Sequence, residues 1–217
     1  MNIILFDKLP SFNLIPLSDD RAKHIIDVLK LKEGDFFKMG IVNESEGKAV
    51  VKSISENGIE FLYSEESKPV LYPVTLVVAQ VRPICMKRIL REAVSLGVGR
   101  IVLTGSQTGE KSYLSSNLYK TGEYKDYLLD GAMQSAHAGL PEVIFASNVT
   151  GALPLSHAEI KSKAVLAIGP ERGWSDYERK LFTEDSFEPM LLGSRVLRTE
   201  TACSTGIAVL LSRMNYL

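Results

Sequence analysis

The sequence lacks the features of secreted, membrane-spanning and disulfide-stabilised proteins. Only two cysteines, Cys85 and Cys203, occur in 217 residues. They are too few for a disulfide framework, and we expect them to be buried apolar residues in a cytoplasmic protein. No run reaches the roughly 18 consecutive apolar residues of a membrane helix. Asp7 and Lys8 directly follow the first apolar run, which is not expected of a signal peptide.

An excess of charge of either sign is also missing. The chain has 25 Lys and Arg against 26 Asp and Glu, a formal net charge of −1, which argues against a protein that coats nucleic acid through bulk electrostatics. Acidic residues are in excess in residues 1–68 and basic residues in 69–217, so the charge distribution does not exclude a local basic surface. His137 and His157 have no Cys or acidic neighbour at metal-ligand spacing, so no metal is expected.

Residues 1–68 are predicted to form a small β-rich domain with one helix. A helix is expected from Ser18 to Lys32, with its apolar residues on one face. The polar stretch Ser64–Pro69 is the predicted linker to the rest of the chain. Three strands, the last two joined by an Asn57-Gly58 turn, are expected at Phe36–Val42, Gly47–Ile54 and Ile59–Tyr63.

Residues 69–217 alternate strands with helices, which predicts an α/β domain with a mostly parallel sheet and helices on both faces. Strands are expected at Val74–Val81, Arg100–Leu103, Ala164–Ile168 and Met190–Leu192, and helices at Lys87–Leu96, from Tyr124 to Ala132, from Ser175 and from Thr199 onward. The helix from Ser175 begins with a capping-box pattern, Ser175 to Glu178.

Two loops at predicted strand ends have the composition of a ligand site. The first, 169–175, reads GPERGWS, and the second, 192–202, reads LGSRVLRTETA. Ligands of open α/β sheets bind at the carboxyl ends of the strands, and a following helix N-terminus favours an anion. Glycines, a proline and two arginines fit such a site, although ordinary turns with solvated arginines have the same composition. Neither loop is a P-loop or a GxGxxG fingerprint.

The two loops together resemble the signature of the RsmE family, close to GPEGG(F/L)S and LG.R(I/V)LRTETA. These enzymes methylate uridine at N3 in small-subunit ribosomal RNA and belong to the SPOUT, or trefoil-knotted, superfamily. The resemblance extends to Lys87–Val98 with its SLGV ending, to Ala132–Ser135, and to His24–Asp35. It therefore covers nearly the whole chain.

The resemblance implies a PUA-like β-barrel in residues 1–68, for RNA recognition, and a knotted methyltransferase domain in residues 69–217. It also implies S-adenosylmethionine as cofactor, 16S ribosomal RNA or the small ribosomal subunit as partner, and a homodimer. The cofactor-binding residues that it implies are Leu103, Thr104, Ile168, Gly169, Pro170, Gly173, Leu192, Gly193, Val196, Leu197, Thr201 and Ala202.

Removal of the uracil N3 proton needs a base or a cation that stabilises the resulting anion. Arg198 is expected to stabilise that anion or to anchor a phosphate. Glu171 or Glu200 is expected to assist proton removal or to hold Arg198, although Glu200 could equally serve only to stabilise a helix N-terminus.

Four further residues are candidates for RNA binding: Arg195, Arg172, His24 and Lys30. For His24, packing or capping is the favoured alternative because it adjoins an apolar helical face. Arg172 stands where the family usually has glycine. That difference keeps two alternatives open, a non-catalytic RNA-binding relative and a SPOUT methyltransferase that acts on another RNA such as transfer RNA.

Overall fold

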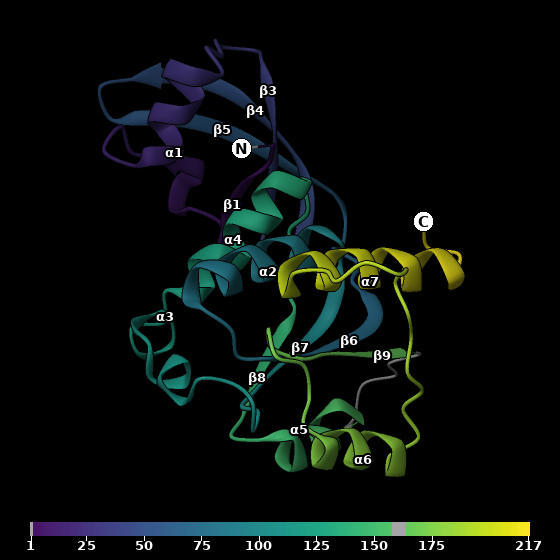
Figure 1. Ribbon diagram of the computed structural model, residues 1–217. Helices are drawn as coiled ribbons and strands as arrows, with labels where there is room; N and C mark the ends of the chain where they lie inside the picture. The colour runs from purple at the N-terminus through teal and green to yellow at the C-terminus, as the bar shows by residue number, and fades with distance from the viewer. Residues whose placement is uncertain (1, 158–163) are drawn as a thin grey trace. The chain divides into compact units, whose positions relative to one another are not determined.

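The computed structural model describes residues 2–157 and 164–217. The chain forms two compact units (Figure 1). One comprises Met1–Val70 and Ala132–Leu140, and the other comprises Leu71–Gly131 and Pro141–Leu217. Nothing in the sequence pattern indicated that residues 132–140 would join the first unit.

The first unit is built on a five-stranded sheet of order β1-β3-β4-β5-β2. The three strands expected from the sequence are present as β3 (Phe36–Ile41), β4 (Ser45–Ser55) and β5 (Gly58–Ser67). Two more, β1 (Ile4–Phe6) and β2 (Leu14–Ile15), are too short to show an alternating pattern. β1 pairs with β3 in parallel, and the other pairs are antiparallel.

The predicted linker is wrong for most of its length, because β5 continues to Ser67. Glu65 pairs with Gly47 and Ser67 pairs with Glu46. Residues 64–67 are all exposed, yet their backbone extends the sheet. A ladder of backbone hydrogen bonds does not require apolar side chains, so a polar composition did not reveal this part of the strand.

The helix expected at 18–32 is shorter and irregular. Asp19 caps α1 (Asp20–Lys23) by accepting a hydrogen bond from the backbone N–H of Arg21. A π-helical turn follows at His24–Val28, and Lys30 ends the segment with a positive φ of 55°. A second short segment, Ser11–Asn13, is a 3-10 helix. Buried apolar residues from the helices and the sheet, among them Ala22, Ile25, Met39, Ile59 and Phe61, form the core of this unit.

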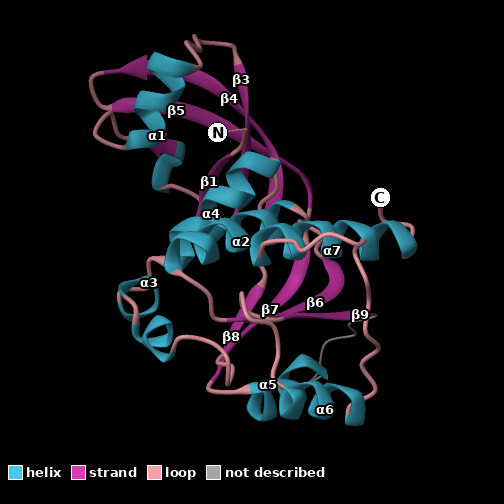
Figure 2. Cartoon of the chain, viewed as in Figure 1, coloured by secondary structure: helices cyan, strands magenta, loops and turns pink. Residues whose placement is uncertain are grey.

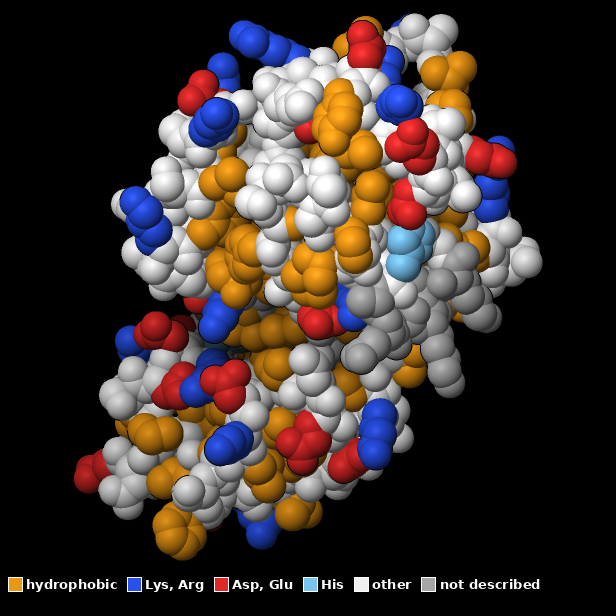
Figure 3. All heavy atoms as spheres, turned by 90° about the horizontal axis from the view of Figure 1, so that it is seen from below, with side chains coloured by type: hydrophobic (Ala, Val, Ile, Leu, Met, Phe, Trp, Pro, Cys, Tyr) orange, Lys and Arg blue, Asp and Glu red, His pale blue; other side chains and the backbone are white. Residues whose placement is uncertain are grey.

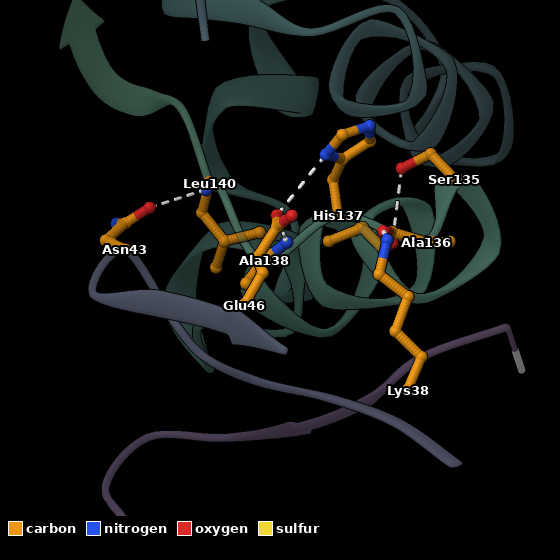
Figure 4. Close-up of polar contacts among 9 residues, drawn as sticks. Lys38, Asn43, Glu46, Ser135, Ala136, His137, Ala138 and Leu140 are labelled. Carbon is orange, nitrogen blue, oxygen red and sulfur yellow. Dashed lines mark hydrogen bonds and ion pairs between the residues drawn. The ribbon is translucent and has the colours of Figure 1, made fainter. Parts of the chain in front are cut away.

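The segment 132–140 is held against β3 and β4 by polar contacts (Figure 4). The carboxylate of Glu46, which is 6 % exposed, accepts hydrogen bonds from the Ala138 backbone N–H at 2.6 Å and from His137 Nδ1 at 3.3 Å. Lys38 Nζ donates to the Ala136 carbonyl at 2.6 Å. The Leu140 N–H donates to the side chain of Asn43 at 2.7 Å. These four contacts explain why the segment is part of the first unit.

The second unit contains the predicted parallel sheet (Figure 2). Its strands are β6 (Tyr72–Ala79), β7 (Val98–Thr104), β8 (Glu142–Ala146) and β9 (Ala164–Ile168), in the order β8-β7-β6-β9 and all parallel. The central strands are buried on both faces, as their nearly continuous apolar sequences predict.

Helices lie on both faces of this sheet, as expected. In Figure 1, α2 (Pro83–Ser95) and α7 (Thr199–Arg213) cover one face, and α5 (Val149–His157) and α6 (Asp176–Glu184) cover the other. The short α3 (Asn117–Lys120), a 3-10 turn at Lys111–Ser115 and α4 (Tyr124–Ser135) connect β7 to β8. Within residues 2–157 and 164–217, no helix combines the length and the apolar character needed to span a membrane.

The strand expected at Met190–Leu192 is not present. These residues belong to the loop between α6 and α7. Met190 is 41 % and Leu191 is 91 % exposed. A short apolar run is compatible with a buried strand, but length and composition alone do not distinguish it from a loop that lines a cavity.

Candidate active site

The two loops that the sequence singled out meet in the second unit. They line a cavity of about 970 Å³ at the carboxyl end of β9, beside the first turns of α2 and α7. The lining residues are Arg82, Cys85, Ala167, Ile168, Gly169, Pro170, Glu171, Arg172, Gly173, Trp174, Arg179, Met190, Leu191, Leu192, Gly193, Arg195, Val196, Leu197, Arg198, Thr199, Glu200 and Ala202.

The first loop is a tight turn whose glycines are required by its geometry. Gly173 has a φ of +70°, and its N–H donates to the Pro170 carbonyl at 2.8 Å. A Cβ on Gly169 would stand 3.1 Å from the backbone nitrogen of Trp174. Arg172 is not among the residues with positive φ, so the turn does not need glycine at that position.

The end of this loop is also the start of α6. Ser175 is the N-cap, and it forms the predicted capping box with Glu178. Trp174 lines the cavity and packs on Phe182, with ring centroids 4.9 Å apart. The indole therefore contributes to packing of the loop.

Glu178 has a further role that the capping motif did not reveal. Its carboxylate, in a residue only 2 % exposed, accepts hydrogen bonds from the backbone N–H of Ser175 at 2.8 Å and of Gln107 at 2.7 Å. The Thr108 hydroxyl donates to the Gly173 carbonyl at 2.5 Å. The loop after β7 is thus joined to the loop after β9, although the paired residues are 71 and 65 positions apart.

Two carboxylates approach one corner of the cavity, at Cys85. Burial raises the pKa of the Cys85 thiol, and the negative charges of Glu200 and Glu171 raise it further. Glu200 is 9 % exposed in the first turn of α7, whereas Glu171 is exposed. Cys85 is half-buried rather than buried as predicted, while Cys203 is buried.

Arginines supply the positive charge of the cavity. Arg198 is the N-cap residue of α7, and its side chain is exposed and makes no capping hydrogen bond. Arg172 and Arg195 are also exposed. Arg82 and Arg179 were not anticipated. The only sequence signal for Arg82 was its place between a predicted strand and a helix, and Arg179 is held by a hydrogen bond to the Trp174 carbonyl at 3.0 Å.

Three of the expected cofactor residues do not line the cavity. Leu103 and Thr104 lie in β7 and are fully buried, and the Thr104 hydroxyl donates to the Gly105 carbonyl. Thr201 is exposed on α7. His24 and Lys30 belong to the first unit, where His24 Nε2 is buried and has no hydrogen-bond partner among the described residues. The roles expected of these five residues stay predictions.

The cavity suits a molecule that has an aromatic ring system, hydroxyl groups and both signs of charge. Ile168, Leu192 and Leu197 provide apolar surface, and Gly193, with a φ of +110°, leaves the backbone open because nothing lies within 4 Å of the place of its Cβ. The carboxylates and guanidinium groups can pair with an ammonium and a carboxylate. S-adenosylmethionine has all of these groups, so the residues present fit it.

Two family models match this chain, and they define the class of protein to which it belongs. The family model described as "RNA methyltransferase domain" matches residues 66–161 and 153–211, and the one described as "RNA methyltransferase PUA domain" matches residues 17–62. The chain is therefore an RNA methyltransferase that carries a PUA domain.

Individual relatives identify the family. Ribosomal RNA small subunit methyltransferase E of Treponema pallidum is 34 % identical, with 98 % of this chain and 91 % of the relative covered. Ribosomal RNA small subunit methyltransferase E 1 of Borreliella burgdorferi is 29 % identical, with 99 % of both covered. The crystal structure of the E methyltransferase from Neisseria gonorrhoeae, bound to S-adenosyl methionine, has the same fold, with a TM-score of 0.77, 20 % identity and 98 % of both chains covered. The chain belongs to the ribosomal RNA small subunit methyltransferase E family.

Proposed function

We propose that this chain transfers the methyl group of S-adenosylmethionine to N3 of one uridine in 16S ribosomal RNA. The observation that carries the proposal is the single cavity in which the GPERGWS and LGSRVLRTETA loops meet. Membership of the methyltransferase E family supports the same reaction.

The cavity would hold the cofactor through its two loops. The backbone of Ile168–Gly169 and of Leu192–Gly193 would hold the adenine, with Leu197 as apolar surface. When bound, S-adenosylmethionine supplies an electrophilic methyl group on a sulfonium, together with its own leaving group. The protein must therefore orient the uridine and handle the N3 proton.

The charged residues of the cavity suit that task. Arg198 would stabilise the negative charge that forms on the uracil, or anchor its phosphate. Glu200 lies in the first turn of α7, and its Oε1 is 3.9 Å from Arg88 Nη1. Glu171 forms no ion pair within the described part of the chain and is exposed, so it is the carboxylate better placed to accept the proton and release it to water.

Arg172 does not favour a non-catalytic relative. Its side chain is exposed at the cavity, and the positive φ of the turn is carried by Gly173. Arg172 and Arg195, both exposed at the cavity, would contact RNA, and His24 and Lys30 of the first unit would add to RNA recognition. We propose that the enzyme works as a homodimer in the cytoplasm, on the small ribosomal subunit.

The decisive experiment is mass spectrometry of 16S ribosomal RNA from a strain without the gene. Loss of one N3-methyluridine, and its return with the wild-type gene but not with Arg198→Ala, supports the proposal. Calorimetry should show that the Arg198→Ala protein still binds S-adenosylmethionine. An unchanged 16S modification pattern, or a missing methyl group in transfer RNA, would refute it.

A further inference from the structure

A second cavity, of about 370 Å³, lies at the carboxyl edge of the sheet, beside the loop that follows β7. Its lining includes Gln80, which directly follows β6, Ser106, which follows β7, and Asn148, which follows β8. Ligands of parallel α/β sheets bind at this edge. None of the lining residues that the structure describes belongs to the GPERGWS or LGSRVLRTETA loop, so the proposed methyl transfer leaves this cavity without a function.

Two buried polar groups in the lining have no partner within residues 2–157 and 164–217. Gln80 is 2 % exposed. Its Oε1 accepts a hydrogen bond from the Tyr119 hydroxyl at 2.5 Å, but its Nε2 donates to no group in the described chain. The buried hydroxyl of Ser106 is likewise unpaired there. Native proteins pair the great majority of their buried polar groups, so two unpaired donors in one cavity indicate a ligand that accepts hydrogen bonds.

Charge does not select the occupant of this cavity. Glu110 and Lys111 are adjacent and exposed in the lining, so an ion of either sign meets a like charge there as well as an opposite one. Leu114, which is 36 % exposed, adds an apolar surface. A nucleobase suits this lining, because it has a flat apolar face and hydrogen-bond acceptors at its edge. Unpaired bases are recognised by contacts to the face and hydrogen bonds to the edge.

One protein loop separates this cavity from the one proposed for the cofactor. Gln107 lines the second cavity, and its side-chain Oε1 accepts a hydrogen bond from the Ser175 hydroxyl at 2.6 Å. The adjacent Thr108 donates to the carbonyl of Gly173, which lines the first cavity. A base in the second cavity is therefore kept apart from the methyl donor and is not the base that is methylated. The base of an adjacent nucleotide fits this place, because both cavities lie at the same edge of the sheet.

We propose that the second cavity binds the base of a nucleotide next to the target uridine, and that the Gln80 amide and the Ser106 hydroxyl select a base with a carbonyl oxygen. This inference rests on the proposed function. Guanine and uracil carry a carbonyl oxygen where adenine and cytosine carry an amino group. An amino group places a donor against two buried donors, which leaves them unpaired. The cavity thus selects which uridine is methylated, whereas the transfer takes place in the first cavity.

Two variants each remove one donor. Ser106→Ala deletes a hydroxyl that has no partner in the described chain. Its matched control is Ser112→Ala, because the exposed Ser112 donates to Glu110 at 3.3 Å and is outside the lining. The double variant with Gln80→Met and Tyr119→Phe removes the amide together with the hydroxyl that pairs with it, so that neither is left without its partner. Tyr119→Phe alone is the control for the double variant.

Methyl transfer is measured on small ribosomal subunits that lack the modification and carry tagged 16S ribosomal RNA, with each of the four bases placed before or after the target. We expect the wild-type enzyme to prefer a carbonyl base at one of these positions by about 10–100-fold in kcat/KM, the effect of leaving a buried donor unpaired. Each donor variant should raise the KM for the preferred subunits about tenfold and reduce that preference. Both kcat at saturating subunits and calorimetric affinity for S-adenosylmethionine should stay within about twofold of the control.

A wild-type enzyme that accepts all four bases equally, or donor variants with unchanged KM and base preference, would overturn the inference, since water then satisfies the two donors. A lower kcat at unchanged KM would also overturn it, because the donors would then act on the reacting base. A raised KM with unchanged base preference would overturn it in favour of a contact to the RNA backbone or to a ribosomal protein. A wild-type enzyme that forms no N3-methyluridine on any of these subunits refutes the proposed function itself, whatever the variants do.

Discussion

Replacing Glu178 by alanine is expected to loosen the cofactor cavity as well as destabilise the second unit. The substitution removes the acceptor for two backbone N–H groups, those of Gln107 and Ser175. Hydrogen bonds to a charged acceptor contribute about 1.5–3 kcal/mol each. Because Gln107 is exposed and Ser175 is half-buried, water can replace part of what is lost. The net loss should be about 2–3 kcal/mol of the free energy of unfolding.

The effect on the cofactor follows from the loop that the carboxylate holds. Without the Glu178 carboxylate, the segment Gly173–Ser175 loses this link to the loop after β7. The segment must then become ordered when the cofactor binds, which lowers the binding affinity. Ordering the backbone of one residue costs about 1–2 kcal/mol, so affinity should fall roughly tenfold. Glu178→Gln keeps one acceptor oxygen but turns an NH₂ group toward the other N–H, and it should show about half of both losses.

The assay is urea unfolding together with calorimetric titration of S-adenosylmethionine, with Glu184→Ala as control. Glu184 lies on the same helix and, among the residues that the structure describes, pairs only with exposed Lys180 at 3.6 Å, so its loss should change stability by less than about 0.5 kcal/mol. If Glu178→Ala matches Glu184→Ala in both measurements, the reasoning is refuted. A loss of stability with unchanged cofactor affinity would refute the link to the cavity.

Three further predictions concern separate parts of the chain. Arg172→Gly should leave S-adenosylmethionine affinity within about twofold, since Gly173 carries the positive φ, but should weaken binding to ribosomal subunits in a filter assay. Glu46→Ala should destabilise the first unit by about 2–3 kcal/mol in urea unfolding, because the Ala138 N–H loses its acceptor, whereas exposed Glu44→Ala should not. The hydrogen bond from Arg21 lowers the pKa of Asp19 below the ordinary value of an aspartate, so Asp19 contributes stability that is present above that ordinary value and is lost as the pH falls through the lower pKa of the folded state. Asp19→Asn should therefore flatten the stability–pH curve in that acid range.

The sequence predicted those parts of the fold whose causes are local. The apolar runs of β6 and β9 and the amphipathic pattern of α2 gave elements close to those observed. The capping box at Ser175 was found because its two residues are three positions apart. The hydrogen bond from Gln107 to Glu178 spans 71 positions, and no local pattern encodes it. The same applies to Glu46 and Ala138, which bring residues 132–140 into the first unit.

The wrong strand prediction at Met190–Leu192 has a different cause, because here a local pattern was present but was misread. Its apolar residues are exposed or half-buried and line the cavity instead of joining the sheet. An apolar side chain is stabilised when it is buried, and either a neighbouring strand or a bound ligand can bury it. A functional loop is therefore where a prediction from hydrophobic pattern is expected to fail.

The charge distribution explains how a chain of net charge −1 can act on RNA. On the face drawn in Figure 3, basic and acidic side chains are interspersed and neither sign forms a continuous field. The first cavity differs, because five arginines and two glutamates line it. Affinity that comes from phosphate contacts grows with their number and weakens with salt in proportion. A few guanidinium groups gathered at the reacting centre thus favour recognition of one nucleotide in a shaped partner over tight binding along a strand.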